Sequence, residues 1–290
     1  MSRIALVTHR GLPRLSPDDQ LLVPALAARG VRAEPAAWDD PDVDWSAFDA
    51  AVMRSAWNYH LETERFDAWL RQMETSGVRL WNSPALLRWN ADKRYLIELS
   101  ARGVPIAHTR VAERGSDVGL DALLEKAGWH EAVVKPLVSA SAHGTWRVSR
   151  PVADEDERRF REQVAERGQI VQRFIPQVVR EGEWSLVFFG GAFSHAVLKR
   201  PASGDFRVQQ EHGGTAERVE PTPDLLNDAR AILSRVPEQT LYARVDGCAL
   251  AGRLMLMELE LLEPSVFLKA DADAAGRFAE AVCRLALTSG

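Results

Sequence analysis

The chain has 290 residues, of which 46% are hydrophobic and 27% are charged, so it is long enough to bury a sizeable core in two or more lobes. Its formal net charge is -5, and the interspersed acidic and basic residues exclude the basic footprint of a nucleic-acid-binding protein. No apolar run reaches the roughly 18 residues that a membrane helix needs. The start of the chain is too polar for a signal peptide. Cys248 and Cys283 stand among apolar residues, as buried thiols do, and we expect a cytoplasmic protein.

The first third of the chain alternates segments typical of strands with segments typical of helices. We expect strands at 4–7, 31–37 and 50–53. A helix should begin near Ser16, between the first two strands, and another should cover 66–73. This strand–helix–strand order predicts a parallel sheet.

Polar and aromatic side chains directly follow the first and third of these strands. Ligands of open parallel sheets bind beyond the carboxyl ends of the strands. An arginine beside small hydrogen-bonding groups also suits a free carboxylate. We therefore predict substrate-binding residues here, with ordinary surface loops as the alternative: His9, Arg10, Arg54, Trp57 and Asn58.

The middle of the chain carries two lysines in positions that suggest anion binding. Lys93 opens a predicted helix that ends near Arg102. Lys135 lies in an apolar strand predicted at 131–138, where a lysine is costly unless it meets an anion. The small polar loop 139–145 follows, and such a loop lets backbone N–H groups approach a phosphate. No Walker motif occurs in the chain, and an ordinary loop is the alternative reading.

The remaining elements are predicted from alternating apolar runs and turn residues. A strand at 170–176 ends at a proline, and strands at 184–189 and 192–198 flank a Gly-Gly turn, which is typical of a hairpin. Helices are expected at 223–234 and 271–287.

Three acidic residues mark the last predicted hairpin. The side-chain period of a strand puts Glu258 and Glu260 on one face, about 7 Å apart. The residues expected on the opposite, core-facing side are Met257, Leu259 and Leu261. A three-residue loop at 251–253 would place Asp246 opposite Glu258, so that three carboxylates converge. Such oxygen ligands suit Mg²⁺ or Mn²⁺, and an edge hairpin with solvated acids is the alternative.

The order of these features resembles that of the ATP-grasp ligases over nearly the whole chain. The matching features are, in order, Lys93, Lys135 with loop 139–145, Gln172 to Pro176, Gly182-Glu183, Lys199, the run GDFRVQQEHGG at 204–214, Asp246, Glu258 and Glu260. The resemblance implies an α/β ATP-grasp fold with α+β lobes. It further implies an N-terminal parallel-sheet domain at 1–88, a central lobe with the phosphate loop at 89–182, and a C-terminal lobe with the metal site at 183–290.

The resemblance also implies a role for each matching residue. Those implied to bind ATP are Lys93, Lys135, Ser141, His143, Gly144, Gln172, Arg173, Phe174, Ile175 and Glu183, with adenine held largely through backbone groups at Arg173 and Ile175. Asp246, Glu258 and Glu260 resemble ligands of Mg²⁺, with Mn²⁺ as the alternative metal. The implied catalytic cations near the transferred phosphoryl group are Lys199, Arg207 and Arg244. The chain departs from the family at Glu260, where Asn is usual, and at Lys199, where glutathione synthetase has an arginine.

Within the family, the runs THR, RSAWNY and ELELLEPS resemble the cyclo-ligase of cycloserine biosynthesis, which closes O-ureido-D-serine into a ring. The implied function is an ATP-dependent ligase that converts a small amino acid's carboxylate to an acyl phosphate, which a nitrogen of the same molecule attacks. The alternatives are an intermolecular carboxylate–amine ligase and a nucleotide-binding module that has lost catalysis. We expect a small amino-acid substrate, no nucleic-acid or membrane partner, and leave a homodimer open.

Overall fold

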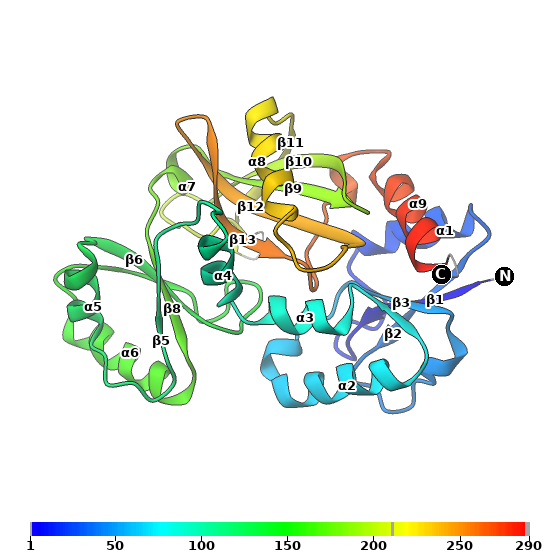
Figure 1. Ribbon diagram of the computed structural model, residues 1–290, viewed down its shortest axis with the longest axis horizontal. Coiled ribbons are helices and arrows are strands. Elements are labelled where there is room, and N and C mark those ends of the chain that lie inside the picture. Colours follow the sequence, from blue (N-terminus) through cyan, green and yellow to red (C-terminus); the bar gives the residue numbers. More distant parts are fainter. Residues whose placement is uncertain (1, 210–211, 288–290) are drawn as a thin grey trace.

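The computed structural model describes residues 2–209 and 212–287, so Gln210 and Glu211 of the GDFRVQQEHGG run lie outside the described residues. These residues form three β-sheets (Figure 1). The sheet of β1 to β4 lies at one end of the molecule and the sheet of β5 to β8 at the other, with a five-stranded sheet between them.

The first sheet is parallel, as predicted, in the order β2-β1-β3-β4. Its strands are β1 (Arg3–Thr8), β2 (Arg32–Ala37), β3 (Ala50–Met53) and β4 (Arg79–Trp81). Its helices are α1 (Leu22–Ala27) and α2 (Thr63–Thr75), with short 3-10 turns η1 (Asp19–Leu21), η2 (Trp45–Ala47) and η3 (Tyr59–Leu61). Ala5, Leu6 and Val7 are fully buried because α1 and α2 cover opposite faces of the sheet (Figure 1).

The sheet at the other end is antiparallel, in the order β5-β8-β6-β7. Its strands are β5 (Thr109–Ala112), β6 (Glu131–Pro136), β7 (Trp146–Ser149) and β8 (Gln169–Arg173). The helices α5 (Leu120–Ala127) and α6 (Asp154–Glu166) pack on one face through Leu124 and Phe160. The other face carries Lys135, at the position where the sequence places a lysine in an apolar strand.

The five-stranded sheet is antiparallel, in the order β11-β10-β9-β12-β13. Its strands are β9 (Glu183–Phe189), β10 (Ala192–Arg200), β11 (Thr215–Val219), β12 (Tyr242–Leu250) and β13 (Arg253–Glu260). The helices α7 (Gln177–Arg180) and α8 (Pro223–Leu233) flank it. The predicted hairpin around Gly190-Gly191 is β9–β10.

The β12–β13 hairpin differs from its prediction in two ways that cancel at Asp246. Leu250 pairs with Arg253, so the loop has two residues where three were predicted. A β-bulge next to Asp246 adds one residue to β13, and this extra residue restores the predicted pairing of Asp246 with Glu258. Met257, predicted to face the core, packs against a hydrophobic cluster and also lines the cavity described below.

Two helices connect the first sheet with the rest of the chain: α3 (Pro84–Ala91) and α4 (Tyr95–Ala101). The sequence reading missed α3, which begins where the Ser83 hydroxyl accepts a hydrogen bond from the Leu86 N–H. The predicted helix at Lys93 begins two residues later than expected. Lys93 itself lies between the two helices, where its N–H donates to the Leu137 carbonyl.

The three predicted segments each hold one sheet, and the division into domains stays a prediction. The last helix, α9 (Ala274–Ala286), lies beside α1, and its Phe278 and Val282 share a core with β1 and β3 (Figure 1). The segment 183–290 is therefore not packed as a separate unit. None of the helices in the described ranges is both long enough and apolar enough to cross a membrane.

Candidate active site

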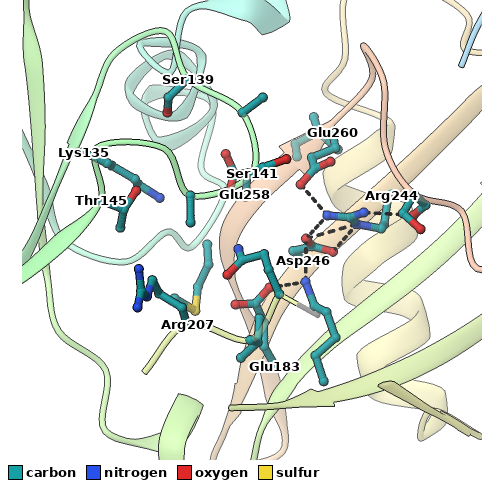
Figure 2. A pocket seen from close by; sticks show the side chains of 18 of the residues that line it. Lys135, Ser139, Ser141, Thr145, Glu183, Arg207, Arg244, Asp246, Glu258 and Glu260 are labelled. Atoms are coloured by element: carbon teal, nitrogen blue, oxygen red, sulfur yellow. Dashed lines mark hydrogen bonds and ion pairs between the residues drawn. The ribbon is translucent and has the colours of Figure 1, made fainter. Parts of the chain in front are cut away.

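A cavity of about 570 Å³, within the usual size range of small-molecule sites, lies where the three predicted segments meet. Trp57 comes from the N-terminal segment, Lys135 and Gln172 from the central one, and Asp246 and Glu258 from the β12–β13 hairpin. Figure 2 shows the phosphate-loop side of this cavity facing the acidic side chains of the hairpin.

Asp246 is the most heavily bonded acid of the cavity. Ser185 donates to its Oδ1 at 2.6 Å, and Lys199 donates to its Oδ2 at 3.0 Å. Arg244 donates to it through Nε and Nη2 (Figure 2). Burial raises the pKa of the Asp246 carboxyl, but Arg244 and Lys199 outweigh it and hold this pKa well below its usual value. Asp246 is therefore ionised although it is 1% exposed.

Glu258 is held by the two predicted phosphate-binding lysines. The Lys93 ammonium lies 3.1 Å from Glu258 Oε1 and donates to the Ser139 carbonyl at 3.0 Å. Burial raises the pKa of Glu258, but the charges of Lys93 and Lys135 lower it to about 2. Lys135 forms no ion pair with a described residue, and burial lowers the pKa of its ammonium. Its charge is thus poorly compensated, as expected of a group that meets an anion.

Two further acids of the cavity hold their protons more tightly. Glu260 lies opposite Arg244 and accepts a hydrogen bond from its Nη2. Burial raises the pKa of Glu260 to about 7, with Asp246 and Glu258 adding to the rise and Arg244 opposing it. Burial, together with the charge of Glu260, raises the pKa of Glu263 to about 8.

The predicted convergence of three carboxylates needs a correction. Within the described residues, no group of three or more metal-ligating side chains is close enough to hold an ion. Arg244 bridges Asp246 and Glu260, and Lys93 pairs with Glu258. The donor chemistry still fits a hard divalent cation, because all three carboxylates line the same cavity. Metal binding would require these ion pairs to open.

The predicted adenine-binding residues line the cavity: Gln172, Arg173, Phe174 and Ile175. The Arg173 N–H already donates to the His108 carbonyl at 2.8 Å. Of the backbone groups of Arg173, only the carbonyl could therefore contact adenine. The Ile175 N–H makes no hydrogen bond with a described residue and is free to donate to a ligand. Of the two predicted backbone contacts, Ile175 thus retains a donor and Arg173 does not.

Part of the phosphate loop faces the cavity and part of it faces away. Ser141 lines the cavity with a left-handed backbone (φ 50°), whereas His143 and Gly144 do not line it. The His143 ring packs against that of His60, with centroids 5.2 Å apart. Gly144 has φ 70°, and a side chain there would meet Pro136. The His143 side chain therefore does not reach the cavity, and the ATP contacts predicted for His143 and Gly144 stay predictions.

The three predicted catalytic cations all line the cavity, each with a protein partner. Lys199 donates to Glu183 Oε1 at 2.6 Å as well as to Asp246. Glu183, predicted to hold the ribose, is therefore ion-paired in this structure. Arg207 pairs with Asp205 at 2.8 Å. Arg244 is described above.

Four of the five predicted substrate-binding residues are not part of the cavity, and only Trp57 lines it. His9 and Arg10 lie outside it, where the Arg10 N–H donates to Asp39. Asn58 bonds Trp38 and the same Asp39, so it fixes the loop rather than facing a ligand.

Arg54 is the clearest of these corrections. Its side chain is fully buried, pairs with Asp19 at 2.9 Å and donates to the Pro264 carbonyl at 2.7 Å. Its guanidinium also lies over the rings of Tyr242 and Phe278. An arginine enclosed in this way cannot reach a substrate in the cavity.

Sequence reasoning missed six residues on the side of the cavity that the N-terminal segment lines. They are Ser16, Asp18, Tyr59, Glu263, Ser265 and Phe267. The alternation of 263, 265 and 267 after the acidic strand is a period-two signal that could have indicated the last three. The first three carry no pattern that separates them from helix-start and loop residues.

We expect Lys135→Ala to weaken ATP binding by about tenfold to a hundredfold without lowering the stability of the fold. A charge-assisted contact with phosphate is worth about 1.5–3 kcal/mol, and the half-buried Lys135 ammonium has no ion pair with a described residue. Calorimetric titration with ATP measures this effect, with the exposed Lys126→Ala as the control. Unchanged affinity would mean that Lys135 does not contact the nucleotide.

Glu260 and Glu263 should each contribute less to the stability of the ligand-free protein as the pH rises from about 4.5 to about 8. The folded-state pKa values of Glu260 and Glu263 are raised above the unfolded value of 4.5, to about 7 and about 8. The folded state therefore keeps protons that the unfolded chain releases, and a higher pH favours unfolding. Urea midpoints at pH 5 and pH 8.5 test this. Glu263→Gln should flatten the dependence relative to the exposed Glu280→Gln, and equal slopes in the two variants would contradict the prediction.

Two family models match the chain. The D-cycloserine synthetase DcsG N-terminal domain matches residues 4–82, and the prokaryotic glutathione synthetase ATP-grasp domain matches residues 96–266. The cycloserine biosynthesis protein DcsG of Streptomyces lavendulae is 32% identical over 97% of this chain and 98% of its own length. A glutathione synthetase of Prochlorococcus marinus is 34% identical over 52% of this chain and 47% of its own length.

Solved structures agree with these matches. The crystal structure of D-cycloserine synthetase DcsG aligns with a TM-score of 0.88 and 32% identity over 98% of this chain and 99% of that one. The D-alanine–D-alanine ligase of Bacillus anthracis complexed with ATP aligns at 0.70 with 18% identity, over 99% and 98% of the two chains, which shows the shared fold alone. This confirms the predicted ATP-grasp fold, in a family that uses ATP and divalent metals. The chain therefore belongs to the ATP-grasp carbon–nitrogen ligases, with an ATP-grasp region of the prokaryotic glutathione synthetase type behind an N-terminal domain of the D-cycloserine synthetase type.

Proposed function

We propose that the protein uses ATP to cyclise a small amino acid, and that its substrate is O-ureido-D-serine and its product D-cycloserine. The observation that carries this proposal is that the segment of the D-cycloserine synthetase type, residues 4–82, supplies Ser16, Trp57 and Tyr59 to the cavity. The segment that would select the substrate is thus the one that matches the N-terminal domain of D-cycloserine synthetase.

The first chemical step is phosphoryl transfer from ATP to the substrate carboxylate. A carboxylate oxygen bonds to the γ-phosphorus, the bond to ADP breaks, and an acyl phosphate forms. We assign Lys93 and Lys135 to the phosphate groups and Lys199 and Arg244 to the charge on the transferring group. Asp246, Glu258 and Glu260 would hold a divalent metal, proposed to be Mg²⁺, which lowers the negative charge around the phosphates when bound.

The second step closes the ring. The oxyamine nitrogen of the substrate bonds to the carbonyl carbon, the bond to phosphate breaks, and inorganic phosphate leaves. The carbamoyl group on that nitrogen must also leave, and with one water molecule it ends as carbon dioxide and ammonia. Because the nucleophile and the carboxylate belong to one molecule, the protein's contribution is to position them and exclude water.

An intermolecular carboxylate–amine ligase is the second candidate, favoured by the match of residues 96–266 to glutathione synthetase. It differs in requiring a second amine substrate for ADP release. The alternative of a nucleotide-binding module without catalysis is disfavoured, because the acids and lysines of the cavity are intact. We further propose a cytoplasmic enzyme with a small-molecule substrate.

Phosphate release across a panel of small amino acids, each with ATP and Mg²⁺, separates these candidates. The proposal expects release with O-ureido-D-serine alone. Release that appears only after a second amine is added would favour the intermolecular ligase, and ATP binding without release across the panel would favour the binding module.

A further inference from the structure

Residues 263–269 lie along the side of the cavity that the N-terminal segment lines. We call them the pinned segment, because hydrogen bonds from other elements hold their backbone. Side chains from several distant elements hold its backbone. The bonds are Trp57 Nε1 to Glu263 O (3.0 Å), Arg54 Nη2 to Pro264 O (2.7 Å), Arg244 Nη1 to Ser265 O (2.8 Å), His195 Nε2 to Val266 O (3.0 Å), and the Leu268 and Lys269 N–H groups to Asp18 (2.9 Å each). With its backbone fixed on both sides, this segment presents its side chains in a defined direction.

The side chains of the pinned segment alternate between the cavity and the core. Glu263, Ser265 and Phe267 line the cavity. Their neighbours Pro264 and Val266 are buried and do not line it. The fixed alternation therefore directs the Glu263 carboxylate toward the cavity.

Glu263 differs from the other acids that line the cavity. Glu183, Asp246, Glu258 and Glu260 each pair with a lysine or arginine, and Asp18 accepts two backbone N–H groups. Within the described part of the chain, the Glu263 carboxyl group has no ion pair and accepts no hydrogen bond from another residue, and only its own backbone N–H interacts with it. Burial makes its charge costly, so the carboxyl group holds a proton in the ligand-free protein and would release it to solvent when a ligand brings a cation beside it.

We propose that the Glu263 carboxylate binds the α-ammonium group of the amino-acid substrate and selects against substrates that lack this group. The inference rests on the proposed function and adds to it the residue that recognises the substrate as an amino acid. The position fits, because Glu263 follows Glu260 by three residues and lines the same cavity as Glu260 and Arg244. The α-amino group is attached to the carbon next to the carboxylate that reacts beside these residues.

This contact also has a chemical consequence for the reaction. An ammonium group has no lone pair, so a substrate amine held as ammonium by Glu263 cannot attack an acyl phosphate. The nitrogen bonded to the side-chain oxygen carries no charge and stays available as the nucleophile. Binding the α-amino group in this form favours ring closure over coupling between two substrate molecules.

Calorimetric titration in the presence of Mg²⁺ and a nonhydrolysable ATP analogue tests the proposal. The two ligands are O-ureido-D-serine and its analogue without the α-amino group, 3-(ureidooxy)propanoic acid. The wild-type protein and the exposed control Glu280→Gln should both bind the amino acid at least about tenfold more tightly than the analogue. Glu263→Gln should bind the two ligands about equally, with unchanged affinity for the ATP analogue. Glu263→Asp keeps the charge and should retain part of the preference. This variant keeps the test informative if Glu263→Gln does not fold.

Each other outcome overturns the proposal in a distinguishable way. Equal binding of the two ligands by the wild-type protein would show that Glu263 does not bind the ammonium group, and so would a preserved preference in Glu263→Gln. The proposed function would stand in both cases. A preserved preference with weakened Mn²⁺ binding in Glu263→Gln would make it a metal ligand instead. If the wild-type protein binds neither ligand, the proposed substrate fails together with this inference.

Discussion

Glu258→Gln should reduce kcat by about a hundredfold to a thousandfold while leaving the fold intact. Glu258 pairs with Lys93 at 3.1 Å, lies opposite Asp246 and stays ionised, with a pKa lowered to about 2. The glutamine keeps the shape and removes the charge that organises the two phosphate-binding lysines and offers a metal ligand. Losses of this size are typical when one preorganised charge is removed from an active site.

Steady-state assay of ADP release, with circular dichroism as the check on folding, measures the effect of Glu258→Gln. Asp228→Asn is the matched control, because Asp228 also pairs with a cation of the same hairpin, Arg253, but does not line the cavity. Activity of Glu258→Gln within a fewfold of the control would remove Glu258 from the catalytic machinery.

Arg54→Ala should lower the free energy of unfolding by about 3–5 kcal/mol. The substitution leaves the Asp19 carboxylate buried without its cation and removes the hydrogen bond to the Pro264 carbonyl. It also empties the space over the Tyr242 and Phe278 rings. Urea unfolding at neutral pH measures the loss.

An exposed ion pair supplies the comparison for Arg54. Arg71 pairs with Asp67, and the arginine side chain is 62% exposed, so Arg71→Ala should cost no more than about 1 kcal/mol. The double variant Arg54→Ala/Asp19→Asn should recover part of the stability, because no unpaired charge is then buried. Equal effects of Arg54→Ala and Arg71→Ala would contradict the role assigned to the buried pair.

The parts of the fold that were predictable are those set by local pattern. The period-two placement of Glu258 and Glu260 and the strand–helix–strand start both follow from residue spacing, and the structure has both. The pairing of Asp246 with Glu258 was predicted through an incorrect loop length, and the bulge in β13 compensated for that error. A bulge depends on packing against the neighbouring strand, and the sequence of one hairpin does not specify it.

The position of Arg54 shows why the substrate side of the cavity could not be predicted. Its chain position, after a parallel strand, is typical of a ligand-binding residue. Its direction is decided by Asp19 and by Pro264, which is 210 residues away. The pinned segment 263–269 likewise owes its conformation to donors and acceptors from distant elements, including Trp57 and Asp18. Such contacts leave no periodic signal in the sequence.

Mass spectrometry of a mixture of the protein, O-ureido-D-serine, ATP and Mg²⁺, with no other amine present, tests the central claim most directly. The cyclisation proposal predicts D-cycloserine, with ADP, phosphate, carbon dioxide and ammonia formed in step with it. A mixture in which ADP and a new amide appear only after a separate amine or amino acid is added would contradict the cyclisation and assign the protein to the intermolecular ligases.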